Sequence, residues 1–477
     1  MCRLRCCCWL AACLVLGGNG CRSLPPGTSV ARQHVEWSVE RSYQSDYSVV
    51  EALPGEASAS WSEPQPLERF VQRALEQNPQ IHAADQRVEA AAAMVVEAGS
   101  LEDPMLAVNG WPFFPFVPQT AAGMMTAEIM VEQRVPWKGK LAARAAAAAQ
   151  ELEAARAQRA ALELEIVEQV KRAYYQLQTV ERTIDTLQKD RATLETLVQV
   201  ALARYQASQA TQQEVLRLQA ELDQVDSQLA EWARQRETAR ADLAQLLHLS
   251  PDTPFVTAAT AADPSAPAEL DELYRRAVAM RPELHAQLAE IQKERYQAQL
   301  ARLDYFPDTN LRAGWAEMTT RRALSPVADG LDMVTVGLSV NLPIYQPRLD
   351  AAVRRADANV VWAAREYDRL RDQTLRDVKQ RFAEATAQRQ IIQLLRDGII
   401  PKTEQAYQVA VQGYQAGTVS FADMLAVWRE LLRYHILLEQ TEGQYRQTLA
   451  SLERLVGGLL PEAPGHPSTT DPAGTEP

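Results

Sequence analysis

The chain has 477 residues, of which 23% are charged, and its formal net charge at pH 7 is −12. This acidic balance argues against nucleic acid as a partner, because phosphate backbones bind basic surfaces. All six cysteines lie within the first 21 residues, which excludes a disulfide framework or a cysteine metal site from the remainder.

Residues 1–20 predict a signal peptide, because Arg3 and Arg5 precede a stretch of apolar and small residues. Cys21 directly follows a Gly-Asn-Gly segment, and this order resembles the bacterial lipobox, whose cysteine becomes lipid-modified. The match departs from the lipobox at Gly18, where a leucine is expected. An ordinary signal peptide with a spare cysteine remains the alternative, and both interpretations predict export.

The rest of the chain divides by composition and by an internal repeat. Pro79 and His82 return 203 positions later as Pro282 and His285, each time with the proline between two short helical patterns. Each histidine stands without a second ligand, so no metal site is predicted. The predicted parts are a lipid-anchored N-terminal arm at 21–66, repeat 1 at 67–249, a linker at 250–268, repeat 2 at 269–460 and a disordered tail at 461–477.

Four segments break the helical rhythm, and the last three of them alternate apolar with polar residues, which is the period of a β-strand. Segments of about ten residues with this period suit a transmembrane β-barrel, and a half-buried sheet in a soluble protein shows the same pattern. The four segments are Pro104–Phe116, Met125–Val135, Pro307–Met318 and Met333–Leu342. Aromatic residues near the ends of these segments suit membrane interfaces: Trp111, Phe113, Phe114, Phe116, Trp137, Trp315 and Tyr345.

The number of strands bears on how they could span a membrane. No run of about 18 apolar residues follows the signal peptide, so no membrane-spanning helix is predicted. Membrane barrels contain at least about eight strands, because an open sheet edge in lipid leaves backbone groups without hydrogen bonds. Four strands cannot close a barrel alone. If they span a membrane, several chains must share one barrel.

Two long helical patterns, each followed by a returning one, carry apolar residues three and four positions apart. A period near 3.5 residues is the signature of coiled-coil packing, so each repeat contains an antiparallel helical hairpin. The first incoming helix, from about Lys140 to Tyr205, would be about 100 Å long at 1.5 Å per residue. Gly398 and Pro401 interrupt the second incoming helix, where a kink is expected.

The turns of the two hairpins repeat each other over residues 203–222 and 412–431. Thr211–Glu214 and Ser420–Asp423 occupy matching places in these turns. Both are typical of capping boxes, in which a hydroxyl and a carboxylate bind free amides of the new helix. The sequence therefore predicts a locally specified turn at the end of each hairpin.

One position distinguishes the two turns. Gly417 lies just past the second incoming helix, where a residue that tolerates positive φ is preferred. Its counterpart in the first turn is Ser208, which tolerates positive φ less well. The second turn is therefore more strongly specified than the first.

The whole arrangement resembles the TolC-like outer-membrane efflux factors, which contain twice over short helices, two strands, a very long helix, a Tyr-x-x-Gly turn and a returning helix. The resemblance covers about Leu67 to Gly458, and its most specific parts are Tyr414–Leu425 and Val336–Pro343. It implies a mainly α fold with a small β part: duplicated long antiparallel coiled-coil hairpins and four transmembrane β-strands per chain. Three chains would share one twelve-stranded barrel, continued by an α-helical tunnel across the periplasm.

The resemblance also implies a function. The chain would be the outer-membrane exit duct of a tripartite efflux or secretion system, passively conducting substrate that an inner-membrane pump and a periplasmic membrane-fusion adaptor deliver. It would need no cofactor, and the sequence carries no nucleophile–base set or cofactor-binding loop that would indicate an enzyme. The residues that match the family's adaptor-facing tips are Tyr205, Ala207, Ser208, Thr211, Glu214, Tyr414, Ala416, Gly417, Ser420 and Asp423.

Asp423 also matches the first acidic residue of the family's tunnel constriction. Ala426 stands where some members have a second acidic residue, and Val419 stands where some have a gating arginine. Two roles for Asp423 therefore stay open, namely capping of the helix and a lumen-facing gate.

Three further alternatives are left open by the sequence. An exported, lipid-anchored coiled-coil scaffold with a small soluble sheet would explain the heptads but not the duplicated strands. A diffusion porin is disfavoured by the capped tips. The cargo is open as well, because methionines near the strands and the segment 136–140 resemble heavy-metal efflux members, whereas packing also explains methionine.

Overall fold

A computed structural model describes residues 61–111, 117–258, 269–321 and 323–460. These residues all belong to one compact unit, Ala57–Pro477. The predicted signal peptide, Cys21, most of the predicted arm, the end of the linker and the tail lie outside the described residues, as do Phe113, Phe114 and Phe116.

The main elements occur in the same order twice along the chain. Repeat 1 contains α3 (Leu67–Gln77), α4 (Pro79–Gly99), β2 (Met105–Gly110), β4 (Gly123–Val135), α5 (Lys140–Gln206) and α6 (Gln212–Leu247). Repeat 2 contains α7 (Leu270–Met280), α8 (Pro282–Leu303), β6 (Thr309–Thr319), β7 (Met333–Val340), α9 (Gln346–Gln393), the π-helix η2 (Leu394–Ile399), α10 (Ile400–Ala416) and α11 (Phe421–Val456).

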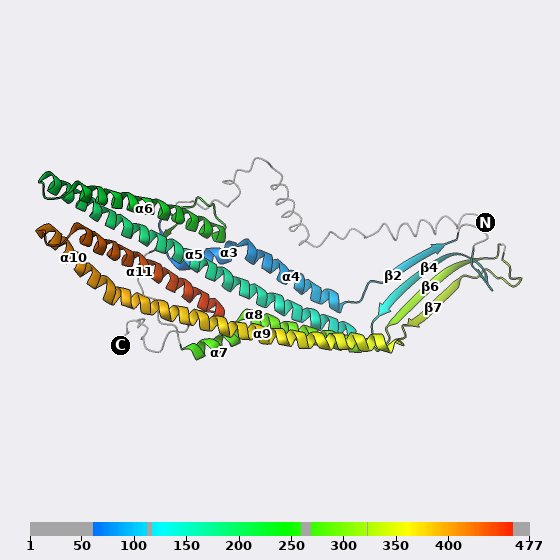
Figure 1. The fold of residues 1–477 in the computed structure, drawn as a ribbon. Helices are drawn as coiled ribbons and strands as arrows, with labels where there is room; N and C mark the ends of the chain where they lie inside the picture. The colour runs from blue at the N-terminus through cyan, green and yellow to red at the C-terminus, as the bar shows by residue number, and fades with distance from the viewer. Residues whose placement is uncertain (1–60, 112–116, 259–268, 322, 461–477) are drawn as a thin grey trace, which may run out of the picture. The chain divides into compact units, whose positions relative to one another are not determined.

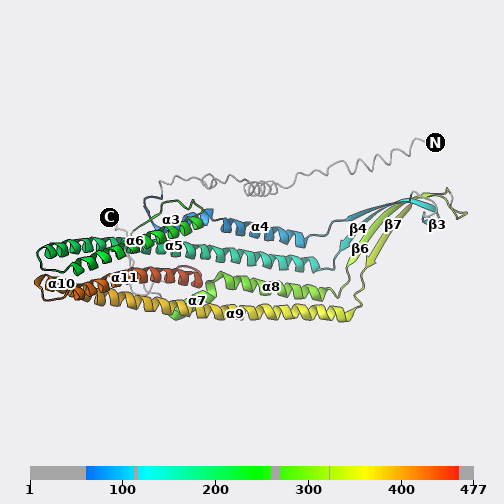
Figure 2. The same ribbon diagram turned by 45° about the horizontal axis from the view of Figure 1, so that its top comes forward.

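Four helices lie side by side next to the sheet. Helix α5 contacts α4 and α8, and α8 contacts α9, so that α4 and α9 are the outer members of the row. In Figures 1 and 2 the strands continue from one end of this row, and the two hairpin turns lie at the opposite end. None of the helices within the described residues has the length and hydrophobicity needed to cross a bilayer.

The four predicted strands form one antiparallel sheet in the order β2-β4-β6-β7. The register pairs Val108 with Ile129 and Ile129 with Trp315, and Trp315 in turn pairs with Val334. Both outer strands, β2 and β7, have one edge without a partner strand among the described residues. The sheet is therefore open on both sides.

Irregular features of the sheet were not predicted. A two-residue strand, β3 (Gln119–Thr120), pairs with the start of β4, and the register of β4 against β6 shifts between Met125 and Ala127. Such a bulge inserts one residue into one strand and increases the local twist. It depends on the partner strand, so the sequence of β4 alone does not predict it.

A second unpredicted feature is the parallel pair of β1 (Pro64–Gln65) and β5 (Val256–Thr257). Beside it, the rings of Trp61 and Phe70 lie 5.1 Å apart, and the ring of Phe255 lies 5.7 Å from that of Trp61. The predicted arm therefore ends, and the predicted linker begins, in packed structure. Strands of two residues have no detectable period, so sequence patterns miss them.

The hairpins carry the predicted heptad seams. Helix α5 has 67 residues, and its seam residues Leu177, Leu187 and Leu194 are fully buried. The expected interruption of the second incoming helix is present as η2, which ends two residues before Pro401. Proline lacks the N–H for an α-helical bond, and a π-helical turn accommodates that loss.

The two hairpins approach each other closely at Gly443 of α11. A Cβ atom at Gly443 would lie 1.9 Å from the hydroxyl oxygen of Thr179 in α5, so only glycine fits there. The backbones of α5 and α11 are therefore so close at this point that no side chain fits between them.

An ionic cluster around a buried lysine joins the sheet to the helices. Lys140, the first residue of α5, is 3% exposed, and its ammonium lies 2.9 Å from Asp308 and 3.1 Å from Asp304. Asp308 also accepts hydrogen bonds from the Trp137 backbone N–H (2.9 Å) and from Arg134 (3.1 Å). Because a buried charge needs partners, the cluster ties the β4–α5 corner of repeat 1 to the α8–β6 corner of repeat 2.

Candidate functional site

The sheet has one apolar face, which is exposed. The strand register places apolar side chains of all four strands on this face, and Val108 is 67% and Val336 83% exposed. A soluble protein buries such a face against its core, and large exposed apolar patches mark contact with a membrane or a partner. The residues of this face are Leu106, Val108, Ile129, Val131, Leu311, Ala313, Trp315, Val334, Val336 and Leu338.

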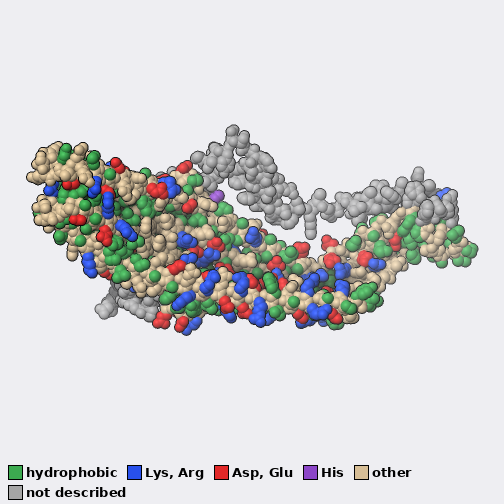
Figure 3. All heavy atoms as spheres, in the orientation of Figure 1, with side chains coloured by type: hydrophobic (Ala, Val, Ile, Leu, Met, Phe, Trp, Pro, Cys, Tyr) green, Lys and Arg blue, Asp and Glu red, His purple; other side chains and the backbone are tan. Residues whose placement is uncertain are grey.

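The opposite face of the sheet carries its charged and amide side chains, together with Met105, Met130 and Met333. Glu132 of β4 forms a salt bridge with Arg312 of β6 (3.1 Å), and Asn109 of β2 donates a hydrogen bond to Glu128 of β4 (3.2 Å). Figure 3 shows charged side chains of both signs interspersed over the helices and few of them over the sheet. The predicted period-two alternation is therefore confirmed as a division of the sheet into an apolar and a polar face.

The first hairpin turn has the predicted capping box. The Thr211 hydroxyl accepts a hydrogen bond from the Glu214 backbone N–H (3.4 Å), and the Glu214 carboxylate accepts one from the Thr211 backbone N–H (3.4 Å). Helix α5 ends just before, at Gln206, and Ser208 adopts a positive φ of 59°. Ser208 therefore adopts the positive φ that the sequence predicted more strongly for Gly417 in the second turn.

The second turn has half of its predicted box. The Ser420 hydroxyl accepts a hydrogen bond from the Asp423 backbone N–H (3.2 Å), as expected of an N-cap. The Asp423 carboxylate accepts a hydrogen bond from the Ser420 hydroxyl (2.7 Å) instead of from the Ser420 backbone N–H. The prediction of a full capping box was therefore wrong in this turn. Aspartate is one methylene shorter than glutamate and does not reach back to the backbone. Gly417 adopts the predicted positive φ, at 78°.

The two tips are joined through Tyr414. Its hydroxyl donates a hydrogen bond to the Glu214 carboxylate (2.8 Å), and its backbone carbonyl accepts one from the Arg204 guanidinium (2.7 Å). The same guanidinium lies 4.4 Å from the centre of the Tyr414 ring, within cation–π range. Burial and the bond to Glu214 raise the pKa of Tyr414 to about 12, so the phenol is a neutral donor at physiological pH.

The predicted tip residues do not all lie in the same environment. Tyr414 is buried, and Glu214, its hydrogen-bond partner, is partly buried. The other eight predicted tip residues are exposed, including the possible constriction residue Asp423. Arg204 was missed, because a single arginine in a long charged helix carries no sequence signal until its partner across the hairpins is known.

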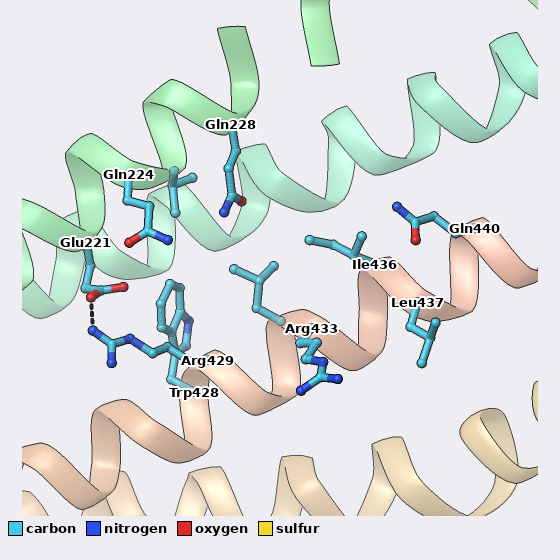
Figure 4. A pocket seen from close by; sticks show the side chains of 11 residues that line it. Glu221, Gln224, Gln228, Trp428, Arg429, Arg433, Ile436, Leu437 and Gln440 are labelled. Carbon is cyan, nitrogen blue, oxygen red and sulfur yellow. Dashed lines mark hydrogen bonds and ion pairs between the residues drawn. The ribbon is translucent and has the colours of Figure 1, made fainter. Parts of the chain in front are cut away.

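A cavity lies between α6 and α11, away from the turns. Its volume is about 410 Å³, and Glu221 and Arg429 form an ion pair at one end of it (Figure 4). Trp428, Ile436 and Gln440 of α11 line it with glutamines of α6. The cavity combines apolar and amide groups and holds no set of side chains arranged for catalysis.

The histidines that the repeat singled out do not form a metal site. His82 is exposed, and the His285 ring lies 2.8 Å from the Ala279 carbonyl. Among the described residues, no three histidine, cysteine or carboxylate side chains are placed to hold one metal ion. Of the methionines near the strands, Met124 and Met318 are buried, which suits packing.

Comparison with known proteins agrees with this geometry. Over 438 residues the chain is 24% identical to the cobalt-zinc-cadmium resistance protein CzcC of Cupriavidus metallidurans, covering 91% of this chain and 99% of that protein. The fold is similar to that of the outer membrane protein VceC of Vibrio cholerae, with a TM-score of 0.69, 21% identity and coverage of 82% and 96%. It is also similar to the outer membrane channel MtrE of Neisseria gonorrhoeae, with a TM-score of 0.66, 18% identity and coverage of 82% and 89%.

The family of outer membrane efflux proteins matches residues 70–248 and 273–458, that is, both repeats. This match confirms the expected TolC-like family, its efflux function and its location in the outer membrane. The similar structures confirm the mainly helical fold with a small sheet. The chain belongs to the outer membrane efflux protein family.

Proposed function

We propose that this chain forms, as a homotrimer, the passive outer-membrane exit duct of a tripartite efflux system. The observation that carries the proposal is the sheet, which has an exposed apolar face, a polar face and two unpaired edges. An unpaired edge cannot stay in lipid, so β2 of one copy pairs with β7 of the next. Three copies supply twelve strands, with the apolar face toward lipid and the polar face toward the lumen.

The helices continue the duct into the periplasm. The row of α4, α5, α8 and α9 begins where the strands end, so three copies of it make the wall of a tunnel. The exposed tip residues, such as Ala207, Ala416 and Ser420, are the surface that a periplasmic membrane-fusion adaptor contacts. The adaptor connects the duct to an inner-membrane pump, which supplies the energy for transport.

The N-terminus adds a second membrane attachment. We propose that residues 1–20 are removed and that Cys21 is lipid-modified, with 21–66 as the anchored arm. The basis is the Gly-Asn-Gly-Cys sequence at the end of the signal peptide. The mass of the N-terminal peptide of the purified protein tests this, since a lipidated Cys21 carries added acyl mass and a Cys21→Ser variant does not.

Divalent metal ions are the first cargo to test. The relative CzcC is named for resistance to cobalt, zinc and cadmium, and it covers nearly the whole of this chain. If this chain exports the same ions, a strain that lacks it becomes sensitive to these salts and unchanged toward unrelated drugs. Sensitivity to drugs alone would contradict a metal cargo and leave the duct itself in place.

The native mass of the protein tests the trimer. The protein is extracted from membranes, and its mass is measured with the bound detergent subtracted. The proposal requires three times the chain mass of 53.1 kDa, reduced by the removed signal peptide, and recovery from the outer-membrane fraction. A water-soluble monomer or dimer would overturn it in favour of the coiled-coil scaffold.

A further inference from the structure

The internal repeat relates the two hairpin tips residue by residue. At an offset of 209 positions, Tyr205 corresponds to Tyr414, and Glu214 corresponds to Asp423. Within one chain, the contact between the tips uses the tyrosine of hairpin 2 and the carboxylate of hairpin 1. The tyrosine of hairpin 1 and the carboxylate of hairpin 2 are left for another contact.

The left-over tyrosine is exposed, and so is a leucine of the same hairpin tip. Tyr205 is 45% exposed, whereas Tyr414 is 7% exposed. In the first turns of the returning helices α6 and α11, Leu216 is 55% exposed and its counterpart Leu425 is 3% exposed. The same residue types are therefore buried by a neighbouring hairpin in one repeat and lack such a neighbour in the other.

The left-over carboxylate is free to accept a hydrogen bond. Glu214 uses one oxygen for the capping box and the other for the Tyr414 hydroxyl. Asp423 likewise uses Oδ2 for the Ser420 hydroxyl, and within the part of the chain that the structure describes its Oδ1 accepts no hydrogen bond. Asp423 therefore uses one oxygen at the helix cap, as Glu214 does, and its second oxygen lacks the tyrosine donor that Glu214 has.

We propose that the Tyr205 hydroxyl of one copy donates a hydrogen bond to the Asp423 carboxylate of the next copy, and that this contact also covers Leu216. The occupant is a second copy because only the hairpin 2 of another chain offers the carboxylate in the place that Glu214 has within the chain. The inference rests on the proposed ring of three copies, in which each hairpin 1 has a hairpin 2 on both sides.

The contact between copies lacks one component of the contact within a copy. The position that corresponds to Arg204 is Gly413, which has no side chain to bind the tyrosine ring and carbonyl. A Cβ atom at Gly413 would lie 2.4 Å from Val419 Cγ2, so the packing of the second turn excludes an arginine there. The link between copies is therefore the weaker one, and the tips separate between copies before they separate within a copy.

Cross-linking between differently tagged chains tests the contact. Tyr205→Cys is placed in one chain and Asp423→Cys in the other, and the two are co-expressed and assembled in membranes. No native cysteine follows residue 21, so the introduced thiols are alone in the folded part. A short bismaleimide is the reagent. A disulfide needs Cα atoms within about 7 Å of each other, and the Cα atoms of a hydrogen-bonded tyrosine and aspartate lie farther apart than this.

The expected result is a product that carries both tags. The control pair combines Lys189→Cys with Asp423→Cys, since Lys189 is exposed on the same helix and lies 16 residues before Tyr205, about 24 Å along the helix at 1.5 Å per residue. The pair Glu214→Cys and Tyr414→Cys in one chain reports the known contact within a copy.

The outcomes separate this inference from the proposed assembly. A trimer that gives no product with both tags, while Glu214→Cys and Tyr414→Cys react within their chain, overturns the contact and leaves the duct. A product from the Lys189→Cys control at an equal yield also overturns it, because the reaction is then not specific. Absence of any trimer overturns the proposed function, and the contact between copies falls with it.

Discussion

The two hairpins carry the same turn signals and end in different environments. Tyr205 and Tyr414 occupy the same place in the repeat, yet one is exposed and the other is held by Arg204 and Glu214. Hairpin 1 enters through one uninterrupted helix of 67 residues, and hairpin 2 enters through α9, η2 and α10. Local sequence specifies the turns, whereas the neighbouring hairpin decides what each side chain does.

The closest contact between the hairpins should give one of the two largest effects. We expect Gly443→Ala to destabilise the protein by about 1–3 kcal/mol, the cost of overpacking, because the new methyl group overlaps the Thr179 hydroxyl. Loss of helical circular dichroism in denaturant measures the change. The control is Gly398→Ala in the same hairpin, where a Cβ atom meets nothing within 4 Å. Equal midpoints for the two variants would contradict the tight contact.

Removal of the hydroxyl group should have different effects at the two tyrosines. Tyr414→Phe leaves Oε2 of Glu214 without its donor and should lower the free energy of local opening by about 1.5–3 kcal/mol, the range for bonds to charged groups. Tyr205→Phe, in detergent-purified protein dissociated to single chains, should change it little. Amide hydrogen exchange of peptides from the two turns measures both. Equal effects would show that the tips are not distinguished by their contacts.

The link through Tyr414 should also depend on pH. Its pKa is raised to about 12 in the folded protein, chiefly by burial, against about 10 in an unfolded chain. The folded state favours the neutral phenol, so the contribution is complete below about pH 10 and is lost as the pH rises toward 12. Denaturation midpoints at several pH values measure this loss. Tyr174 titrates in the same range, so the difference between wild type and Tyr414→Phe isolates the link.

The positive-φ positions of the two hairpin turns should respond in opposite directions. Gly417→Ala places a Cβ atom at φ 78° and should cost about 1–2 kcal/mol. Ser208→Gly relieves the same strain at φ 59° in the first turn and should stabilise that turn. Hydrogen exchange in each turn provides the measurement. Faster exchange after Ser208→Gly would show that the serine side chain, and not its backbone, governs the turn.

The smallest effects should come from the helix caps. Thr211→Ala and Ser420→Ala should each cost about 1 kcal/mol, the usual value of an N-cap. Thr211→Ala should cost more, because it disrupts a box with bonds in both directions. Serine at 211 and threonine at 420 keep the hydroxyls and serve as matched controls for the same exchange measurement.

Local and periodic features were predictable, and features that depend on distant partners were not. The strands, the heptad seams and the caps at Thr211 and Ser420 follow from residues within one or two turns of each other. The burial of Tyr414, by contrast, depends on Arg204, which lies 210 positions away. The ionic cluster at Lys140 escaped prediction for the same reason, since Asp308 belongs to the other repeat.

Lys140 has a consequence for how the two halves can exist. Its ammonium is buried, and both carboxylates that neutralise it come from repeat 2. A fragment that stops after α6 would expose this corner or bury an unpaired cation, which is costly. The repeats resemble each other in sequence, but the buried cation of repeat 1 depends on carboxylates of repeat 2. The corner around Lys140 can reach its final structure only after the residues of repeat 2 have been synthesised.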